Sequence, residues 1–485
     1  MKKSAYIFIT MVAVLVGAWL LYSGHPLNSG PSADGVSAQA ASTGLFPAPD
    51  HTVYNMDLYL EPSSATLHGD TWLSTVNTSG QPMEYLWFTL YPNAFRDPSQ
   101  SPAPAEAYYA GFDPGWLQVE SVVVNGEEVT SEEQGMSLRA LLSRPVQPGG
   151  KLEINLRWQA RIPRLAYRYG SKDGVFMLGN FYPTLNALGG EGWHLAYNSC
   201  FGDPFCFHTA DYLVRINIPQ EYQMVSTGRQ IDALAEDNGR ATYLVAAEKV
   251  RDFCLVVLYD YHELSKQSRG IKTTCFFPAR GEYAAAGILN ESTQILDYFA
   301  GIYGSYPYPE FKVVFVPMKG FQGMEYSGLI FLRDEFLEPG PDPGYGEFIL
   351  AHEIAHQWWY GMVGNDQLKE PWLDEGLANW SANKYLEKYR GREIPDAGEL
   401  RNGVNLDRSL AEMYSRPEYY RTAYSGGEAF WSGLEKELGG EEAVFKVLRK
   451  YLADYRYCIA TTRDLCRVIQ EESRQDISEY LSRWF

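Results

Sequence analysis

The pentapeptide His352-Glu353-Ile354-Ala355-His356 constrains the fold of this chain more than any other feature. It lies in residues 348–361, a stretch whose sequence predicts a helix. Residues four apart lie on one face of a helix, so the two imidazoles can bind one metal ion. Glu353 projects beside them, where it can accept a proton from a water molecule. The sequence therefore predicts a metal site on this helix.

Glu375 is the third candidate ligand. It follows His356 after eighteen intervening residues and begins a second helical stretch, residues 375–389. Two His and one carboxylate with an open fourth position are typical of catalytic zinc, whereas a structural zinc is closed by four ligands, often Cys. We therefore expect one Zn²⁺ per chain, bound by His352, His356 and Glu375. The remaining histidines show no ligand spacing and are expected to be ordinary surface or core residues: His25, His51, His68, His194, His208 and His262.

Hydrophobic patterning divides the rest of the chain into two regions. Up to about residue 261, apolar residues alternate with polar ones, and Asn125-Gly126 is a strong hairpin signal. Strand-like and helical segments follow: 271–277 and 312–317, then 282–303, 348–361, 375–389 and 428–438. We predict an α+β multidomain protein, with a curved β-sheet domain (50–264) followed by a mostly helical domain (265–485).

The N-terminus is predicted to be a membrane segment. Lys2 and Lys3 precede an uncharged run of 18 residues, 5–22, which can cross a bilayer as a helix. No Lys or Arg follows until Arg96, so the positive-inside rule places the rest of the chain outside the cytoplasm. We expect a membrane anchor (1–22), a flexible tether (23–49), and a catalytic domain on the extracytoplasmic side of the cell membrane.

The alternative is a signal peptide cleaved at Ala38-Gln39-Ala40, which would make the protein secreted. Both interpretations export the folded domains, and the even count of six cysteines then permits disulfides. Cys200 and Cys206 flank a turn-like segment and can either pair or remain thiols.

The acidic composition excludes one class of partner. Lys and Arg total 41 and Asp and Glu total 60, which gives a net charge of −19. Because such a surface repels a phosphate backbone, we expect no nucleic-acid binding.

These residues resemble the aminopeptidase N family of gluzincin zinc metallopeptidases, which also includes leukotriene hydrolase. H-E-x-x-H, eighteen residues and Glu form that family's metal signature. Gln322-Gly323-Met324-Glu325-Tyr326 is similar to its G-x-M-E-N loop, whose Glu binds the free amino group of the substrate. Tyr424-Ser425-Gly426-Gly427 is similar to its Y-x-K-G segment, whose Tyr stabilises the transition state. The resemblance extends from about residue 51 to the end and implies a thermolysin-like catalytic domain.

The sequence also departs from the family pattern. Tyr326 replaces the Asn of the loop and Gln322 its first Gly, while Asp374 and Gly426 stand where the family has Asn and Lys. The family's β-domain glutamate or glutamine, which contacts the substrate amine, has no secure match. Because the chain ends at Phe485, we expect a minimal version without the C-terminal helical domains.

The resemblance implies a zinc peptidase that releases N-terminal residues from peptides with a free N-terminus. Glu353 and Tyr424 would be catalytic, and Glu325, with Gly323 and Met324, would bind the substrate. Two alternatives stay open. One is an endopeptidase or another hydrolase on the same scaffold. The other is an inactive surface-anchored peptide-binding protein, against which the intact metal-ligand and base residues argue.

Overall fold

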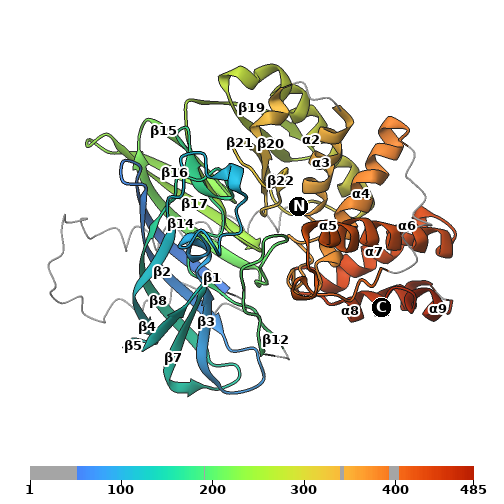
Figure 1. The fold of residues 1–485 in the computed structure, drawn as a ribbon, viewed down its shortest axis with the longest axis horizontal. Helices are drawn as coiled ribbons and strands as arrows, with labels where there is room; N and C mark the ends of the chain where they lie inside the picture. Colours follow the sequence, from blue (N-terminus) through green and yellow to red (C-terminus); the bar gives the residue numbers. More distant parts are fainter. Residues whose placement is uncertain (1–51, 190–191, 339–342, 393–403, 474) are drawn as a thin grey trace.

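The computed structural model of the protein describes residues 52–189, 192–338, 343–392, 404–473 and 475–485. A region of β-sheets, blue to green, lies beside a mostly helical region, yellow to red (Figure 1). The β-sheet region comes first in the chain, as predicted. The predicted anchor (1–22) and tether (23–49) lie outside the described residues. Within the described part of the chain, no helix is long and apolar enough to span a membrane.

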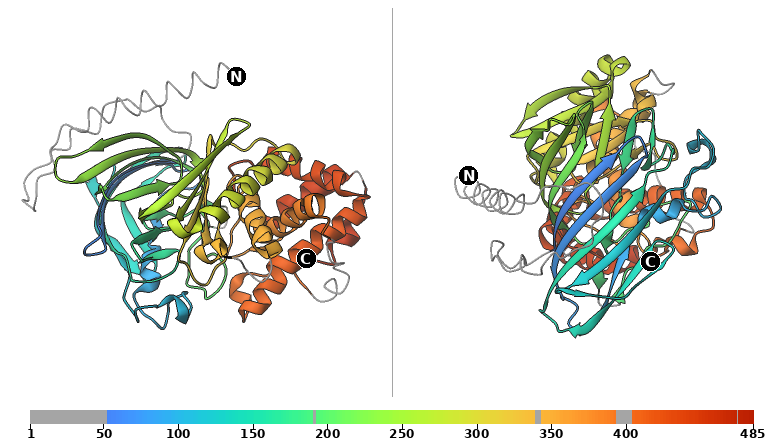
Figure 2. Two further views of the ribbon diagram at one scale, coloured as in Figure 1. Left: turned by 90° about the horizontal axis from the view of Figure 1, so that it is seen from above. Right: turned by 90° about the vertical axis from the view of Figure 1, so that its left-hand side faces the viewer.

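The first region is built from one large sheet and several smaller ones. The eight-stranded sheet has the order β16 (Arg229–Ala235), β17 (Arg240–Val250), β14 (Ala210–Pro219), β1 (Thr52–Glu61), β2 (Thr66–Val76), β8 (Lys151–Arg161), β4 (Trp116–Val124) and β5 (Glu127–Glu128). One four-stranded sheet has the order β15 (Tyr222–Ser226), β18 (Leu255–Tyr259), β10 (Val175–Leu178) and β9 (Tyr169–Lys172). A second four-stranded sheet has the order β11 (Thr184–Leu185), β3 (Met83–Thr89), β7 (Ser137–Val146) and β6 (Ser131–Gln134). A short ribbon pairs β12 (Leu188–Gly189) with β13 (Gly192–Trp193). Seen from above, the strands of this region curve (Figure 2).

The predicted alternation accounts for the core of this region. On β1 the apolar set Tyr54, Met56, Leu58 and Leu60 is buried. Successive strand residues point to opposite faces of a sheet, so one face of β1 is apolar throughout. The predicted hairpin also forms, because Asn125 and Gly126 adopt positive φ angles of 50° and 82° between β4 and β5.

The second region combines a five-stranded sheet with helices. The sheet order is β19 (Tyr261–Ser268), β20 (Ile271–Pro278), β21 (Glu310–Val316), β23 (Leu329–Arg333) and β22 (Gly323–Met324). The helices are α2 (Glu282–Ile302), α3 (Pro343–Ala355), α4 (Trp372–Arg390), α5 (Arg416–Tyr419), α6 (Gly427–Leu438), α7 (Glu441–Tyr455), α8 (Thr462–Ser473) and α9 (Ser478–Leu481). The domain boundary expected at residue 264 falls inside β19.

The expected extent of the helix at residues 348–361 is wrong at its C-terminal end, because α3 ends at Ala355. The amides of Gln357 and Trp358 bond to carbonyls three residues back, at 3.1 and 3.0 Å, which tightens the last turn. The amide of His356 still bonds to the carbonyl of His352 at 3.3 Å. The histidine pair therefore keeps its helical spacing although His356 follows the helix.

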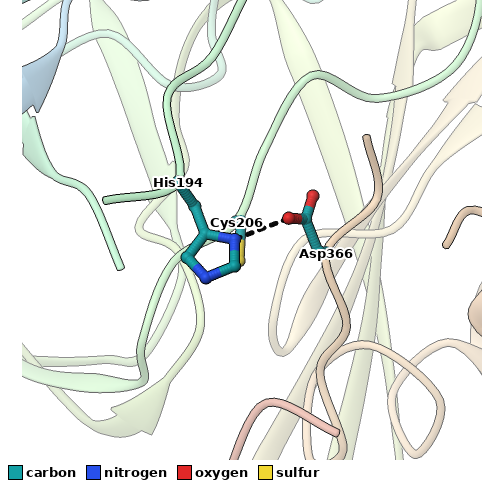
Figure 3. Close-up of side chains that lie close together, drawn as sticks. All are labelled: His194, Cys206 and Asp366. Carbon is teal, nitrogen blue, oxygen red and sulfur yellow. Dashed lines mark hydrogen bonds and ion pairs between the residues drawn. The ribbon is translucent and has the colours of Figure 1, made fainter. Parts of the chain in front are cut away.

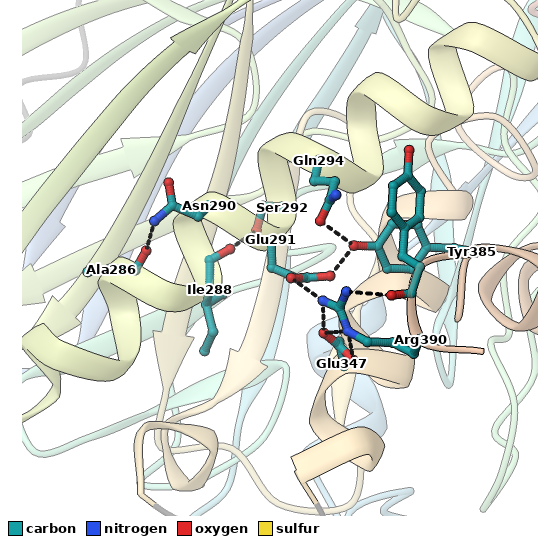
Figure 4. A network of polar contacts seen from close by, with 10 residues as sticks. Ala286, Ile288, Asn290, Glu291, Ser292, Gln294, Glu347, Tyr385 and Arg390 are labelled. Carbon is teal, nitrogen blue, oxygen red and sulfur yellow. Dashed lines mark hydrogen bonds and ion pairs between the residues drawn. The ribbon is translucent and has the colours of Figure 1, made fainter. Parts of the chain in front are cut away.

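A polar network fixes α3 and α4 against α2 (Figure 4). Arg390 at the end of α4 donates to Glu347 of α3 through Nε at 2.8 Å and to Glu291 of α2 through Nη2 at 2.8 Å. Tyr385 donates to Glu291 and, at 3.0 Å, to Gln294. The helices α3 and α4 are thus cross-linked to α2.

Candidate active site

The three predicted metal ligands converge between α3 and α4. The Nε2 atoms of His352 and His356 lie 3.1 Å apart. Glu375 Oε2 lies 3.2 Å from the first and 3.5 Å from the second. All three side chains are buried. The fold therefore brings together donors that are separated by eighteen residues of sequence.

Neighbouring groups aim the imidazoles at this point. His356 Nδ1 lies 2.9 Å from the carbonyl oxygen of Trp359, and a proton there leaves the Nε2 lone pair free. The ring of His352 stacks on Tyr424, with centroids 5.7 Å apart and planes 11° apart. Both rings are thereby held in orientations that present Nε2 to a shared ligand.

The surroundings of Glu375 are suited to a bound cation. Its Oε1 accepts hydrogen bonds from the hydroxyls of Tyr419, at 3.2 Å, and Tyr424, whereas its buried Oε2 has no aligned hydrogen bond. Burial would raise the pKa of Glu375, but contacts with both imidazoles hold it well below its usual range. A buried carboxylate facing two imidazole nitrogens is a donor set that Zn²⁺ prefers, so these residues fit zinc.

Two glycines bring Tyr424 to Glu375. A Cβ on Gly376 would lie 2.6 Å from Cα of Gly427, so α4 and α6 touch through their backbones. The preceding residues, Tyr420–Gly426, form a π-helical turn that carries Tyr424. Such turns are rare and frequently occur at functional sites.

Glu353 lies against the edge strand β22. A Cβ on Gly323 would lie 2.4 Å from Glu353 Oε1, so only glycine allows this approach. Burial raises the pKa of Glu353 to about 8. The neighbouring Met324 is buried in the core beside Tyr326 and Phe331.

Residues 288–484 match the sequence profile of the peptidase family M1 domain. The helical region of this chain is therefore similar to the peptidase family M1 domain. Aminopeptidase M1-B of Oryza sativa subsp. japonica is 27% identical over 269 residues, which are 50% of this chain and 29% of the rice protein. Glutamyl aminopeptidase of Bos taurus is 23% identical over 312 residues, which are 59% of this chain and 32% of the bovine protein. The chain thus aligns with less than a third of the length of each of these relatives.

Solved structures share the fold of the helical region together with that of the β-sheet region. An M1 zinc metallopeptidase from Deinococcus radiodurans has a TM-score of 0.66 at 17% identity, with 89% of this chain and 92% of that chain covered. A mutant of that enzyme bound to a Tyr-Ser-Ala substrate has a TM-score of 0.62 at 17% identity, with 90% and 94% covered. The predicted fold class, a β-sheet domain followed by a mostly helical domain, is confirmed.

Glu325, which follows β22, lies close enough to the predicted metal ligands His356 and Glu375 for their charges to act on it. It is buried, and burial together with the nearby Asp203 raises the pKa of its carboxyl well above the usual range. Gln367 Nε2 bonds to Glu325 Oε1 at 3.4 Å and to Asp374 Oδ2 at 2.8 Å. Burial and the adjacent Glu375 raise the pKa of Asp374 to about 7. Gln367 thus links the loop of Glu325 to the start of α4.

Tyr326, which departs from the family pattern, points away from the metal ligands. A Cβ on Gly179 would lie 1.8 Å from the Tyr326 hydroxyl oxygen, so this ring reaches into the β-sheet region. Gln357 ties the loop to the turn that follows α3, because its Nε2 donates to the carbonyl of Tyr326 at 3.1 Å and its Oε1 accepts from the amide of Gly328 at 2.8 Å. The substitution therefore alters the junction behind the loop.

The sequence did not reveal that the β-sheet region contributes a buried ion pair to the site. Arg168 and Asp203 are bonded to each other, and Arg168 lies 4.2 Å from the ring centroid of Phe321. The Asp203 charge acts on both Glu325 and Glu353. One Asp in a Gly-Asp-Pro turn carries no signal that separates it from an ordinary turn residue.

Proposed function

We propose that this protein is a zinc-dependent aminopeptidase that binds peptides with a free N-terminus and hydrolyses their first peptide bond. The observation that carries the proposal is the convergence of the donors of His352, His356 and Glu375 beside Glu353, with Glu325 facing the same point. The relatives named aminopeptidases support this choice of reaction.

The residues divide the chemistry among them. Zinc, when bound, supplies a Lewis acid that activates water and polarises the scissile carbonyl. Glu353 accepts the proton of the attacking water and delivers it to the leaving amine. The hydroxyl of Tyr424, on release from Glu375, donates a hydrogen bond to the developing oxyanion.

Restriction to the first peptide bond requires a group that binds the substrate ammonium. Glu325 is buried beside the Arg168–Asp203 ion pair, and a substrate ammonium would favour the charged form of Glu325 and balance its charge. We assign Glu325 as the main contact. An endopeptidase or another hydrolase on the same scaffold remains the second candidate, because the zinc donors and Glu353 would serve either reaction. An inactive peptide-binding protein is disfavoured because it has no need of four intact zinc and base residues.

Aminoacyl reporter substrates test the proposal. The purified protein should release amino acids from them, lose this activity when zinc is chelated, and regain it when zinc is restored. Peptides with an acetylated N-terminus should be poor substrates, because acetylation removes the charge that Glu325 binds. Equal cleavage of blocked and free peptides would instead support the endopeptidase.

We further propose that the protein acts outside the cytoplasm on an uncleaved N-terminal anchor. Lys2, Lys3, the uncharged residues 5–22 and the lack of basic residues before Arg96 support this location. Protease added to intact cells should remove the folded domains. A mature N-terminus near Ala41 would contradict the anchor and support secretion.

A further inference from the structure

A second group of metal-binding side chains lies at the junction of the two regions. His194, Cys206 and Asp366 each offer one donor atom, and these atoms lie within 4.8 Å of one another. His194 follows β13 and Cys206 precedes β14, whereas Asp366 lies between α3 and α4 (Figure 3). His194, expected from the sequence to be an ordinary surface or core residue, thus has two other potential metal ligands beside it.

Backbone hydrogen bonds hold the three segments in place. The amide of His194 donates to the carbonyl of Ala187 at 3.0 Å, and the amide of Ala187 donates to the carbonyl of Cys206 at 3.2 Å. The amide of Gln367, next to Asp366, donates to the carbonyl of Phe205 at 3.2 Å. Each donor residue is thus fixed directly or through its sequence neighbour, as a preformed site requires.

The carboxylate and the imidazole are oriented toward each other. Asp366 Oδ2 lies 2.6 Å from His194 Nδ1. The other oxygen, Oδ1, accepts from the amides of Leu368 and Lys369 at 3.0 and 3.2 Å. These bonds leave Oδ2 as the oxygen that faces the cluster.

Cys206 is the unsatisfied member of the group. The residue is 4% exposed, and its thiol forms no disulfide and has no hydrogen-bond partner among the residues that the structure describes. The pairing of Cys200 with Cys206 that the sequence permitted does not occur, since both are free thiols. In Figure 3 the sulfur lies behind the imidazole, on the side that faces Asp366. A buried thiol beside an imidazole and a carboxylate is a donor set for a borderline metal ion.

We propose that His194, Cys206 and Asp366 form a second zinc site, which joins the β-sheet region to the loop between α3 and α4. Binding releases the Cys206 thiol proton to solvent and moves the His194 proton from Nδ1 to Nε2. One dication then balances one thiolate and one carboxylate. Ligand bonds of about 2.0 Å require Nδ1 and Oδ2 to move to roughly 3.3 Å apart, a small opening of the present hydrogen bond.

A metal ion in this second site would stabilise the loop between α3 and α4, which contacts Glu325 through Gln367. Asp366 directly precedes Gln367, whose side chain bonds to both Glu325 and Asp374. A metal ion bound by Asp366 would therefore fix the position of Gln367 relative to the β-sheet region. This role would be structural, with a water molecule as the fourth ligand beside the three side chains, and it does not depend on the proposed peptidase reaction.

Cobalt distinguishes the two sites, because only the second contains sulfur. The full-length protein should be stripped of metal, loaded with Co²⁺ and examined for a thiolate-to-cobalt charge-transfer band in the near ultraviolet. Zinc per chain should be measured in parallel after gel filtration. We expect the band and two zinc ions in the wild type. Cys206→Ala should lose the band and retain one zinc, whereas Cys200→Ala, the matched control, should keep both.

The converse experiment removes a ligand of the first site, Glu375, and leaves the second site intact. Glu375→Gln should weaken the first site and leave the cobalt–thiolate band intact. Absence of the band in the wild-type protein would overturn the proposal without any variant having to fold. Survival of the band in Cys206→Ala would overturn it as well, by assigning the sulfur to another cysteine.

Discussion

The hydroxyls of Tyr419 and Tyr424 provide a matched pair for testing which tyrosine acts in catalysis. Both donate to Glu375 Oε1, so removal of either deprives the same zinc ligand of one hydrogen bond. They differ in exposure, because Tyr419 is buried whereas Tyr424 is partly accessible beside His352. We therefore expect Tyr424, rather than Tyr419, to turn its hydroxyl toward a bound substrate.

The shared and the specific effects of the two variants can be separated in magnitude. A hydrogen bond to a charged group contributes about 1.5–3 kcal/mol, so Tyr419→Phe and Tyr424→Phe should each weaken zinc affinity by roughly tenfold to hundredfold. An oxyanion donor contributes a further factor of about 10²–10³ in kcat. Tyr424→Phe should therefore lower kcat by this factor, whereas Tyr419→Phe at saturating zinc should leave kcat within about threefold of the wild type.

Steady-state kinetics on an aminoacyl reporter, at zinc concentrations that saturate both variants, measure the difference. The KM of Tyr424→Phe should change little, because its hydroxyl bonds mainly to the transition state. Equal kcat values for the two variants would refute the assignment of Tyr424 and leave both tyrosines as supports of Glu375.

The remaining predictions concern three carboxylates. Glu353→Gln should keep its zinc, measured by metal analysis, and lose about 10²–10⁴ in kcat, and near-normal turnover would exclude it as the base. Glu375→Gln should lose zinc in dialysis that leaves the wild type loaded, and unchanged retention would remove it from the ligand set. Glu325→Ala should retain zinc and lose about tenfold to hundredfold in kcat/KM on free peptides, from a contact of about 1.5–3 kcal/mol, with no comparable loss on acetylated ones.

The sequence predicted the zinc donors because short-range geometry fixes them. The spacing of His352 and His356 requires only that one helical turn forms, and that turn survives although α3 ends at Ala355. The alternation on β1 predicted its buried face for the same reason, since the period of a strand is a local property. Both inferences needed no knowledge of which distant segments meet.

The supporting residues could not be predicted in this way. Gln367 acts through contacts with Glu325, forty-two residues away, and Arg168 pairs with Asp203 thirty-five residues later. Neither residue belongs to a spacing pattern, and each becomes identifiable only when the fold juxtaposes the segments. The contact of Gly376 with Gly427 could not be predicted either. A glycine in a helix indicates close packing, but the sequence does not show which segment packs against it.

The junction between the two regions explains why the β-sheet region would be part of the proposed catalytic unit. Arg251 follows β17 and is buried, and a buried cation is tolerated only when its donors are satisfied. Its Nε donates to the carbonyl of Tyr360 at 3.0 Å, Nη1 to that of Phe207 at 2.9 Å, and Nη2 to that of Cys458 at 3.0 Å. One guanidinium thus joins the loop before β14 to two segments of the helical region. The zinc donors all lie in the helical region, but the charge of Asp203 that faces Glu325 comes from the other side of this junction. The geometry that would select a free N-terminus therefore depends on both regions being docked.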